Sequence, residues 1–131
     1  MTDPDGAQPD ATSVLLPGPW AHRDVSANGV RLHAAEAGEG PLVLLLHGFP
    51  QFWWAWRNQL TGLAAAGLRA VAPDLRGYGA SDKPPRGYDL PTAAADAAAV
   101  IRRLQLMAIV IIEMTRGSHL IEMGYLSLIH I

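Results

Sequence analysis

A short run of apolar residues constrains the fold of this 131-residue chain more than any other feature. Val43–Leu46 is continuous aliphatic sequence, and it stops abruptly at His47-Gly48. A strand with one wet face alternates apolar and polar residues, whereas a strand covered on both faces does not. The run therefore predicts a strand of a parallel sheet that helices cover on both sides, which is the α/β class.

The segments around this strand support the same class. Asn28-Gly29 lies between two alternating segments, and its tolerance of positive φ predicts an antiparallel hairpin over residues 23–35. Downstream, we expect a helix of about four turns from Phe52, ended by Gly67 at C′, and an Ala-rich second helix with Thr92 as its N-cap. The other expected elements are a strand at 69–73, a loop at 74–85, the second helix at 93–104 and a third buried strand at 107–112.

Length, charge and cysteine content exclude several functional classes. The length suits one domain, and the absence of cysteine excludes disulfides and thiolate metal sites. A net charge of −2 gives no electrostatic surface for nucleic acid. No apolar run approaches the ~20 residues of a membrane helix, and the N-terminus lacks a secretory signal. We therefore expect a cytoplasmic protein with no cofactor, no metal, no nucleic-acid partner and no membrane partner, while the oligomeric state stays open.

The composition changes abruptly after Leu104. The segment 105–131 holds six of the seven Ile and three of the four Met, but no Pro and no Asp. This change favours a foreign tail rather than the natural continuation of the chain, the alternative being one more buried strand followed by a loop. The sequence thus divides into a mobile, Pro- and Gly-rich leader at 1–18, a domain at 19–104 and this tail.

Two motifs carry chemical information. Residues 44–56 read LLLHGFPQFWWAW, and residues 72–84 read APDLRGYGASDKP. In this order, separated by a helix and a strand, they resemble the α/β-hydrolase superfamily and, within it, the epoxide-hydrolase-like branch. The resemblance runs from about Val25 to Leu104. It implies the N-terminal part of an α/β-hydrolase fold, in which a hairpin leads into a mainly parallel sheet with flanking helices.

The His47–Pro50 turn stands where such a fold binds ligands, at the carboxyl edge of the sheet. Gly48 permits close approach of a substrate, and Pro50 allows a cis Phe49–Pro50 bond. The resemblance implies that the backbone N–H of Phe49 contributes to the oxyanion hole, with a second donor from the residue after the nucleophile. We interpret His47 as a structural residue that bonds nearby backbone, since the family's catalytic His does not lie there.

Several other side chains allow two interpretations. Helical spacing assigns Trp53 and Trp56 to the core, whereas Trp54 is a candidate for the substrate pocket or the surface. Asp74 with Arg76 is expected to form an ion pair or a turn hydrogen-bond site rather than a catalytic group.

The catalytic groups of the family are not found where the resemblance places them. The nucleophile should follow the strand after the second helix, where the sequence reads AIVIIEMTRGSH, and no Asp follows Asp96. Thr115 and Ser118 lack the flanking small residues of a nucleophile elbow. We therefore expect the N-terminal portion of a hydrolase, cut at about Leu104 and inactive alone, whose parent opens epoxides of small hydrophobic molecules through an Asp ester. The alternatives are a haloacid dehalogenase, an esterase of the same fold, or a non-catalytic half-fold binding protein.

The composition change predicts what the genomic DNA contains. We expect one of the three frames downstream of codon 104 to continue with a strand and a nucleophile elbow centred on Asp or Ser. Sequencing of the genomic DNA and the transcript tests this. A confirmed frame that runs unchanged to a stop after Ile131 would contradict it and leave the binding-protein hypothesis.

Overall fold

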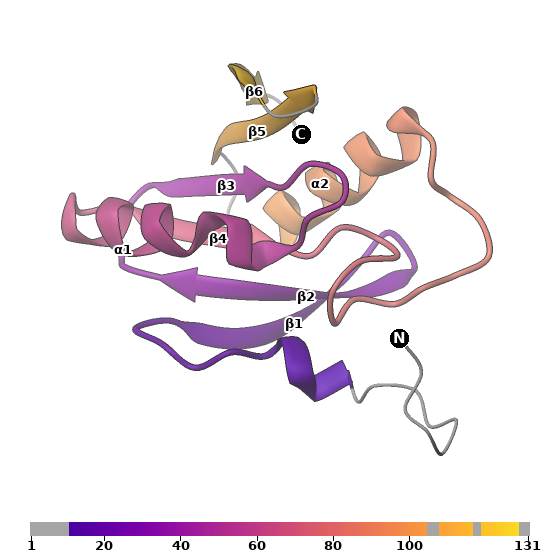
Figure 1. Cartoon of the computed structure of the whole chain (residues 1–131), viewed down its shortest axis with the longest axis horizontal. Coiled ribbons are helices and arrows are strands. Elements are labelled where there is room, and N and C mark those ends of the chain that lie inside the picture. Colours follow the sequence, from indigo (N-terminus) through magenta and orange to yellow (C-terminus); the bar gives the residue numbers. More distant parts are fainter. Residues whose placement is uncertain (1–10, 105–107, 117–118, 129–131) are drawn as a thin grey trace.

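The computed structural model describes residues 11–104, 108–116 and 119–128, with side chains at 13–104 and 108–112. These residues form one mixed sheet with helices packed against it (Figure 1). The sheet has six strands in the order β1-β2-β4-β3-β5-β6. Their bounds are β1 Ala21–Ala27, β2 Val30–Ala37, β3 Leu42–Leu46, β4 Arg69–Pro73, β5 Ala108–Arg116 and β6 His119–Leu128.

The apolar run forms the central strand, as predicted. β3 runs parallel to β4 on one side and to β5 on the other, and all five of its residues are buried. The remaining pairs, β1–β2, β2–β4 and β5–β6, are antiparallel. The parallel part of the sheet is therefore its middle, and its carboxyl edge is where β3, β4 and β5 end.

Alternate residues of β3 contact different helices, which places one helix on each face of the sheet (Figure 1). Leu44 packs with Val100 and Ile101 of helix α2 (Leu90–Leu104). Leu45 packs instead with Leu60 of helix α1 (Arg57–Ala65) and with Trp53 of the preceding 3₁₀ turn η2 (Trp53–Trp56). A strand with both faces covered must be apolar throughout, which explains its sequence.

The hairpin and the end of the first helix follow the predicted local chemistry. Asn28 and Gly29 have φ values of 50° and 78°, and Ala27 pairs with Val30 across the turn. Gly67 has φ 83°, and its N–H donates to the carbonyl of Ala64 while the Leu68 N–H donates to that of Leu63. These two bonds define a Schellman motif with glycine at C′.

The start of α2 corrects the predicted cap. The helix begins at Leu90, three residues earlier than expected, and Asp89 rather than Thr92 is the capping residue. The Asp89 carboxylate accepts hydrogen bonds from the Thr92 hydroxyl, at 2.8 Å, and from its backbone N–H, at 3.0 Å. These bonds lower the pKa of Asp89. Pro91 lies in the first turn, where its missing N–H needs no partner.

Glu36 joins three strands of the sheet. Its carboxylate binds Arg23 of β1 and Arg69 of β4, and the Arg69 guanidinium also donates to the carbonyl of Leu104 at the end of α2. Burial alone would raise the pKa of Glu36, but the hydrogen bonds from Arg69 and Arg23 outweigh it, so that the pKa is lowered. The ionised carboxylate therefore stabilises this edge of the fold.

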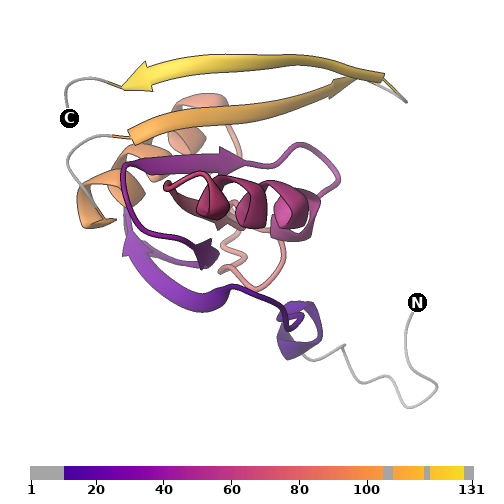
Figure 2. The ribbon, with the colours of Figure 1, turned by 90° about the vertical axis from the view of Figure 1, so that its left-hand side faces the viewer.

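The described residues at the two ends contact the rest of the fold, while the division into a leader and a foreign tail stays a prediction. Residues 1–10 lie outside the described part, but residues 11–14 form a 3₁₀ turn, and the carbonyls of Val14 and Leu16 accept hydrogen bonds from the rings of Trp53 and His22. At the other end, β5 extends beyond the expected strand, whose Met107 is not described, and pairs antiparallel with β6 (Figure 2). Within the described residues, no helix is long and apolar enough to cross a membrane.

Burial on both faces predicts that β3 is sensitive to truncation. Leu44→Ala should lower the free energy of unfolding by about 2–5 kcal/mol, because the lost side chain leaves a cavity. Urea unfolding followed by tryptophan fluorescence measures this. Leu90→Ala is the matched control: Leu90 is 85% exposed, so the same deletion should change stability by no more than about 0.5 kcal/mol. Equal effects would contradict the assignment of β3 as the central strand.

Candidate functional site

A tight turn follows β3 at the carboxyl edge of the sheet. The Gln51 N–H donates to the Gly48 carbonyl at 2.9 Å, and the Gln51 side-chain oxygen accepts from the Gly48 N–H. The Phe49–Pro50 peptide bond is cis, as the sequence allowed. The Phe49 side chain is 76% exposed. An apolar ring is thus presented at the end of a rigid central strand.

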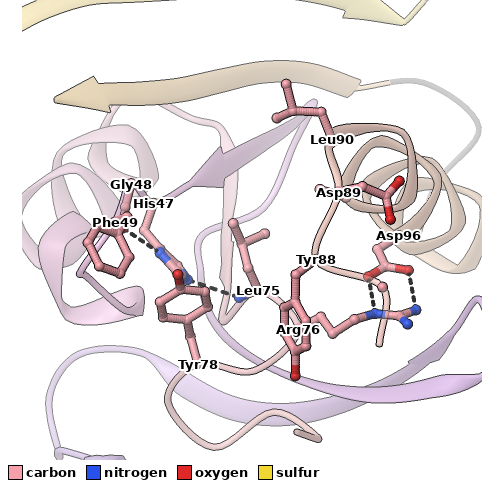
Figure 3. Close-up of a pocket in the computed structure, with 12 residues that line it drawn as sticks. His47, Gly48, Phe49, Leu75, Arg76, Tyr78, Tyr88, Asp89, Leu90 and Asp96 are labelled. Carbon is pink, nitrogen blue, oxygen red and sulfur yellow. Dashed lines mark hydrogen bonds and ion pairs between the residues drawn. The ribbon is translucent and has the colours of Figure 1, made fainter. Parts of the chain in front are cut away.

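His47 holds this turn against the loop that follows β4. Its Nε2 accepts the Leu75 N–H at 2.9 Å, so that Nδ1 carries the ring proton and faces the Gly48 carbonyl at 3.0 Å. The ring is 3% exposed and lies edge-on to Tyr78 (Figure 3). A ring whose two nitrogens both bond backbone agrees with a structural role.

Asp74 organises the second loop. Its carboxylate is fully buried and accepts the N–H of Trp53 at 2.7 Å and that of Ala80 at 3.0 Å. It also contacts His33 at 2.7 Å, and its backbone carbonyl accepts the Ser81 hydroxyl. The expectation of a turn hydrogen-bond site is confirmed, and the alternative of an Asp74–Arg76 ion pair is wrong.

Arg76 pairs with α2 instead. Its guanidinium makes two hydrogen bonds of 2.9 Å to the buried carboxylate of Asp96, which raise the pKa of Arg76 (Figure 3). The Asn28 amide binds the same carboxylate from the β1–β2 turn at 2.8 Å. Sequence reasoning missed this cluster because its three members are far apart in the chain.

The two loops and the start of α2 enclose a pocket of about 300 Å³ (Figure 3). Residues of the turn after β3 and of the loop after β4 both contribute to the lining. The remaining wall contains residues that the sequence did not indicate, among them Tyr88 and Leu90, which are exposed apolar side chains. Its full lining is His47, Gly48, Phe49, Leu75, Arg76, Tyr78, Gly87, Tyr88, Asp89, Leu90, Ala93 and Asp96.

The tryptophans lie elsewhere. Trp53 and Trp56 are buried in the core, as predicted. Trp54 is not among the residues that line this pocket; it packs edge-on against Trp20 and Trp53, and Arg57 lies over its ring at 5.0 Å. Its candidacy as a pocket residue therefore stays a prediction.

The segment expected to hold the nucleophile forms a hairpin. The backbone of 108–116 runs as one strand and pairs antiparallel with 119–128, where the resemblance implies a turn into a helix. Thr115 lies inside this pairing, and Ser118 is outside the described residues. Within the described residues 108–116 and 119–128, a second strand and not a helix follows β5, unlike the strand–turn–helix of a nucleophile elbow.

The family follows from comparison with known proteins. A family model described as "Alpha/beta hydrolase family" matches residues 43–120. This chain belongs to that family, and over part of its length it is similar to epoxide hydrolases.

Several epoxide hydrolases are similar to part of this chain. Epoxide hydrolase 1 of Siraitia grosvenorii is 55% identical over 64 residues, which are 49% of this chain and 20% of the relative. Bifunctional epoxide hydrolase 2 of Sus scrofa is 45% identical over 86 residues, 64% of this chain and 16% of the relative. The solved epoxide hydrolase from an endophytic Streptomyces has a TM-score of 0.71 and 47% identity, covering 74% of this chain and 30% of its own. The chain thus spans about a fifth of the curated relatives and about a third of the solved structures.

The packing around Asp74 gives a sharp stability prediction. A Cβ at Gly79 would lie 2.1 Å from the Asp74 carboxylate, and φ is +50° there. Gly79→Ala should therefore lower the free energy of unfolding by about 2–4 kcal/mol. Gly62→Ala is the control, because a Cβ in that helical position meets nothing within 4 Å; it should stabilise by about 0.5–1 kcal/mol. Similar values from urea unfolding would refute the close approach at Gly79.

Proposed function

We propose that this chain carries the oxyanion turn and part of the substrate pocket of an epoxide hydrolase. The observation that carries the proposal is the His47–Pro50 turn, which borders the pocket at the carboxyl end of the central strand. Support comes from the named epoxide hydrolases that are similar over this segment.

In epoxide hydrolysis, the His47–Pro50 turn would stabilise the negative oxygen of a tetrahedral intermediate. A carboxylate nucleophile attacks an epoxide carbon, the C–O bond breaks, and the alkoxide takes up a proton to leave a hydroxyalkyl ester. Water activated by a base then attacks the ester carbonyl, and the tetrahedral intermediate carries a negative oxygen. The backbone N–H of Phe49 donates to that oxygen, a contribution typically worth ~3–4 kcal/mol in acyl-transfer enzymes.

The pocket suits an apolar substrate. The exposed rings and side chains of Phe49, Tyr88 and Leu90 are available for contact with a hydrophobic group on the epoxide. The polar side chains Arg76 and Asp96 in the lining are already bonded to each other. We therefore propose a small hydrophobic epoxide as the substrate, with the nucleophile and base supplied by a full-length parent rather than by this chain alone.

A chimera tests the proposal. Residues 25–104 replace the matching segment of the Streptomyces epoxide hydrolase, and hydration of an aryl epoxide is measured alongside hydrolysis of an aryl ester. We expect the chimera to hydrate the epoxide, and the 131-residue chain alone to show no rate above the uncatalysed one. A cooperatively folded chimera without epoxide turnover would contradict the proposal.

Single variants of the chimera test which side chains contact the substrate. Phe49→Ala keeps the backbone N–H but removes the exposed ring, so KM should rise about 5–30-fold, corresponding to ~1–2 kcal/mol of apolar contact, with little change in kcat. Phe52→Ala is the matched control, since Phe52 packs against the core cluster of Trp53 and Leu60; KM should not change. Trp54→Phe tests whether Trp54 lines the substrate pocket. A pocket role predicts a higher KM for this variant, and an unchanged KM would rule that role out.

A further inference from the structure

A chain of hydrogen bonds runs behind the candidate site from the N-terminal segment to Asp74. His22 Nε2 lies 2.8 Å from the Leu16 carbonyl, and His22 Nδ1 lies 2.8 Å from His33 Nε2. His33 Nδ1 in turn lies 2.7 Å from the Asp74 carboxylate. The two imidazole rings have centroids 5.0 Å apart and planes inclined by 28°. Three successive contacts thus join two acceptor oxygens through two histidines.

These three hydrogen bonds need more protons than two neutral imidazoles carry. Each hydrogen bond needs one proton, so the three contacts need three. Two neutral imidazoles carry two protons, and an ionised carboxylate and a carbonyl carry none. Three complete hydrogen bonds therefore require one proton more than the two neutral rings supply.

The position of the extra proton follows from the acceptors. The Leu16 carbonyl can only accept, so His22 Nε2 donates to it and His22 Nδ1 is free to accept from His33. Both carboxylate oxygens of Asp74 accept backbone N–H groups, from Trp53 and from Ala80, which is the acceptor role of an ionised group. The third proton then lies between the two rings, and the adjacent Asp74 carboxylate favours His33 over His22 as its carrier, so that His33 donates from both nitrogens.

We propose that His33 is an imidazolium that forms a buried ion pair with Asp74 and, through it, fastens the two loops that border the candidate site. His33 is 2% exposed and Asp74 is 0% exposed, so each charge needs the other as its partner. The clamp reaches both loops because Asp74 holds the N–H of Trp53, just after the His47–Pro50 turn, and that of Ala80, in the loop after β4.

The surroundings give the proton a path to solvent. His22 is half-buried and, with His33, lines a cavity of about 400 Å³ on the β1–β2 side. The charged groups that face this cavity are Arg23, Asp24 and Arg31. Glu36 and Asp82 pair with the two arginines, and Asp24 pairs with Arg31. From the other elements packed here, η2 contributes the uncharged ring of Trp53, and the loop contributes Ser81 and Ala80.

The ring protons can be observed directly, independently of any catalytic activity. The full 131-residue chain is labelled with ¹⁵N in histidine, and ring nitrogen shifts and their proton couplings are recorded at about pH 7, where an ordinary His is mostly neutral. We expect His33 to carry protons on both nitrogens. His47 serves as the internal control, since its acceptance of the Leu75 N–H requires a single proton on Nδ1. A single ring proton on His33, whatever the state of His22, would overturn the proposal.

A variant tests the link to the loops. His22→Phe removes the acceptor of the His33 Nε2 proton, so we expect His33 to become neutral and to keep only its Nδ1 proton for Asp74. With the ion pair lost, exchange of the Trp53 and Ala80 amide hydrogens should quicken about tenfold, while that of Gly67, whose N–H donates to the Ala64 carbonyl, should not. Unchanged exchange at Trp53 and Ala80 would show that the pair does not fasten the loops. Should His22→Phe not fold, the wild-type spectrum still decides the charge of His33.

Discussion

The buried carboxylate of Asp74 is the contact on which the candidate site depends. It lies just after β4 and accepts backbone N–H groups at the start of η2, just after the His47–Pro50 turn, and in the loop after β4, together with a contact to a histidine on β2. Removing a carboxylate from water is costly, and only a full set of donors compensates it. Because those donors come from Trp53 and Ala80, satisfying the charge also fixes the relative position of the two loops. The neighbouring glycine at position 79 leaves room for it.

The sheet supplies the frame for this contact. β3 and β4 run parallel, so the chain leaves both strands at one edge, and the His47 ring joins the two exits through backbone bonds. The α2 helix closes the third side through the Arg76–Asp96 pair. Three segments that are distant in the sequence therefore line the pocket: the turn after β3, the loop after β4 and the start of α2. The parallel topology of β3 and β4 brings them to the same edge of the sheet.

Local signals in the sequence predicted what local physics decides. The hairpin at Asn28-Gly29, the helix end at Gly67 and the central strand at Val43–Leu46 each depend on a few adjacent residues, and each is confirmed. Pairings between residues far apart in the chain could not be predicted from adjacent residues. Arg76 had a near candidate in Asp74, but the structure pairs it with Asp96, twenty residues away, because Asp74 is committed to backbone donors. The helix cap moved from Thr92 to Asp89 because a carboxylate can accept from both the hydroxyl and the N–H of Thr92.

The β5–β6 hairpin has a consequence for assembly. β6 pairs with β5 from Ala108 to Arg116, so the hydrogen-bonding edge of β5 that faces away from β3 is already occupied. A complementing polypeptide that adds a strand there competes with β6 for the same donors and acceptors. Its association is then a strand exchange, in which departure of β6 precedes docking. At saturating concentration of such a polypeptide, the observed rate would level off at the opening rate of the hairpin instead of rising in proportion to concentration.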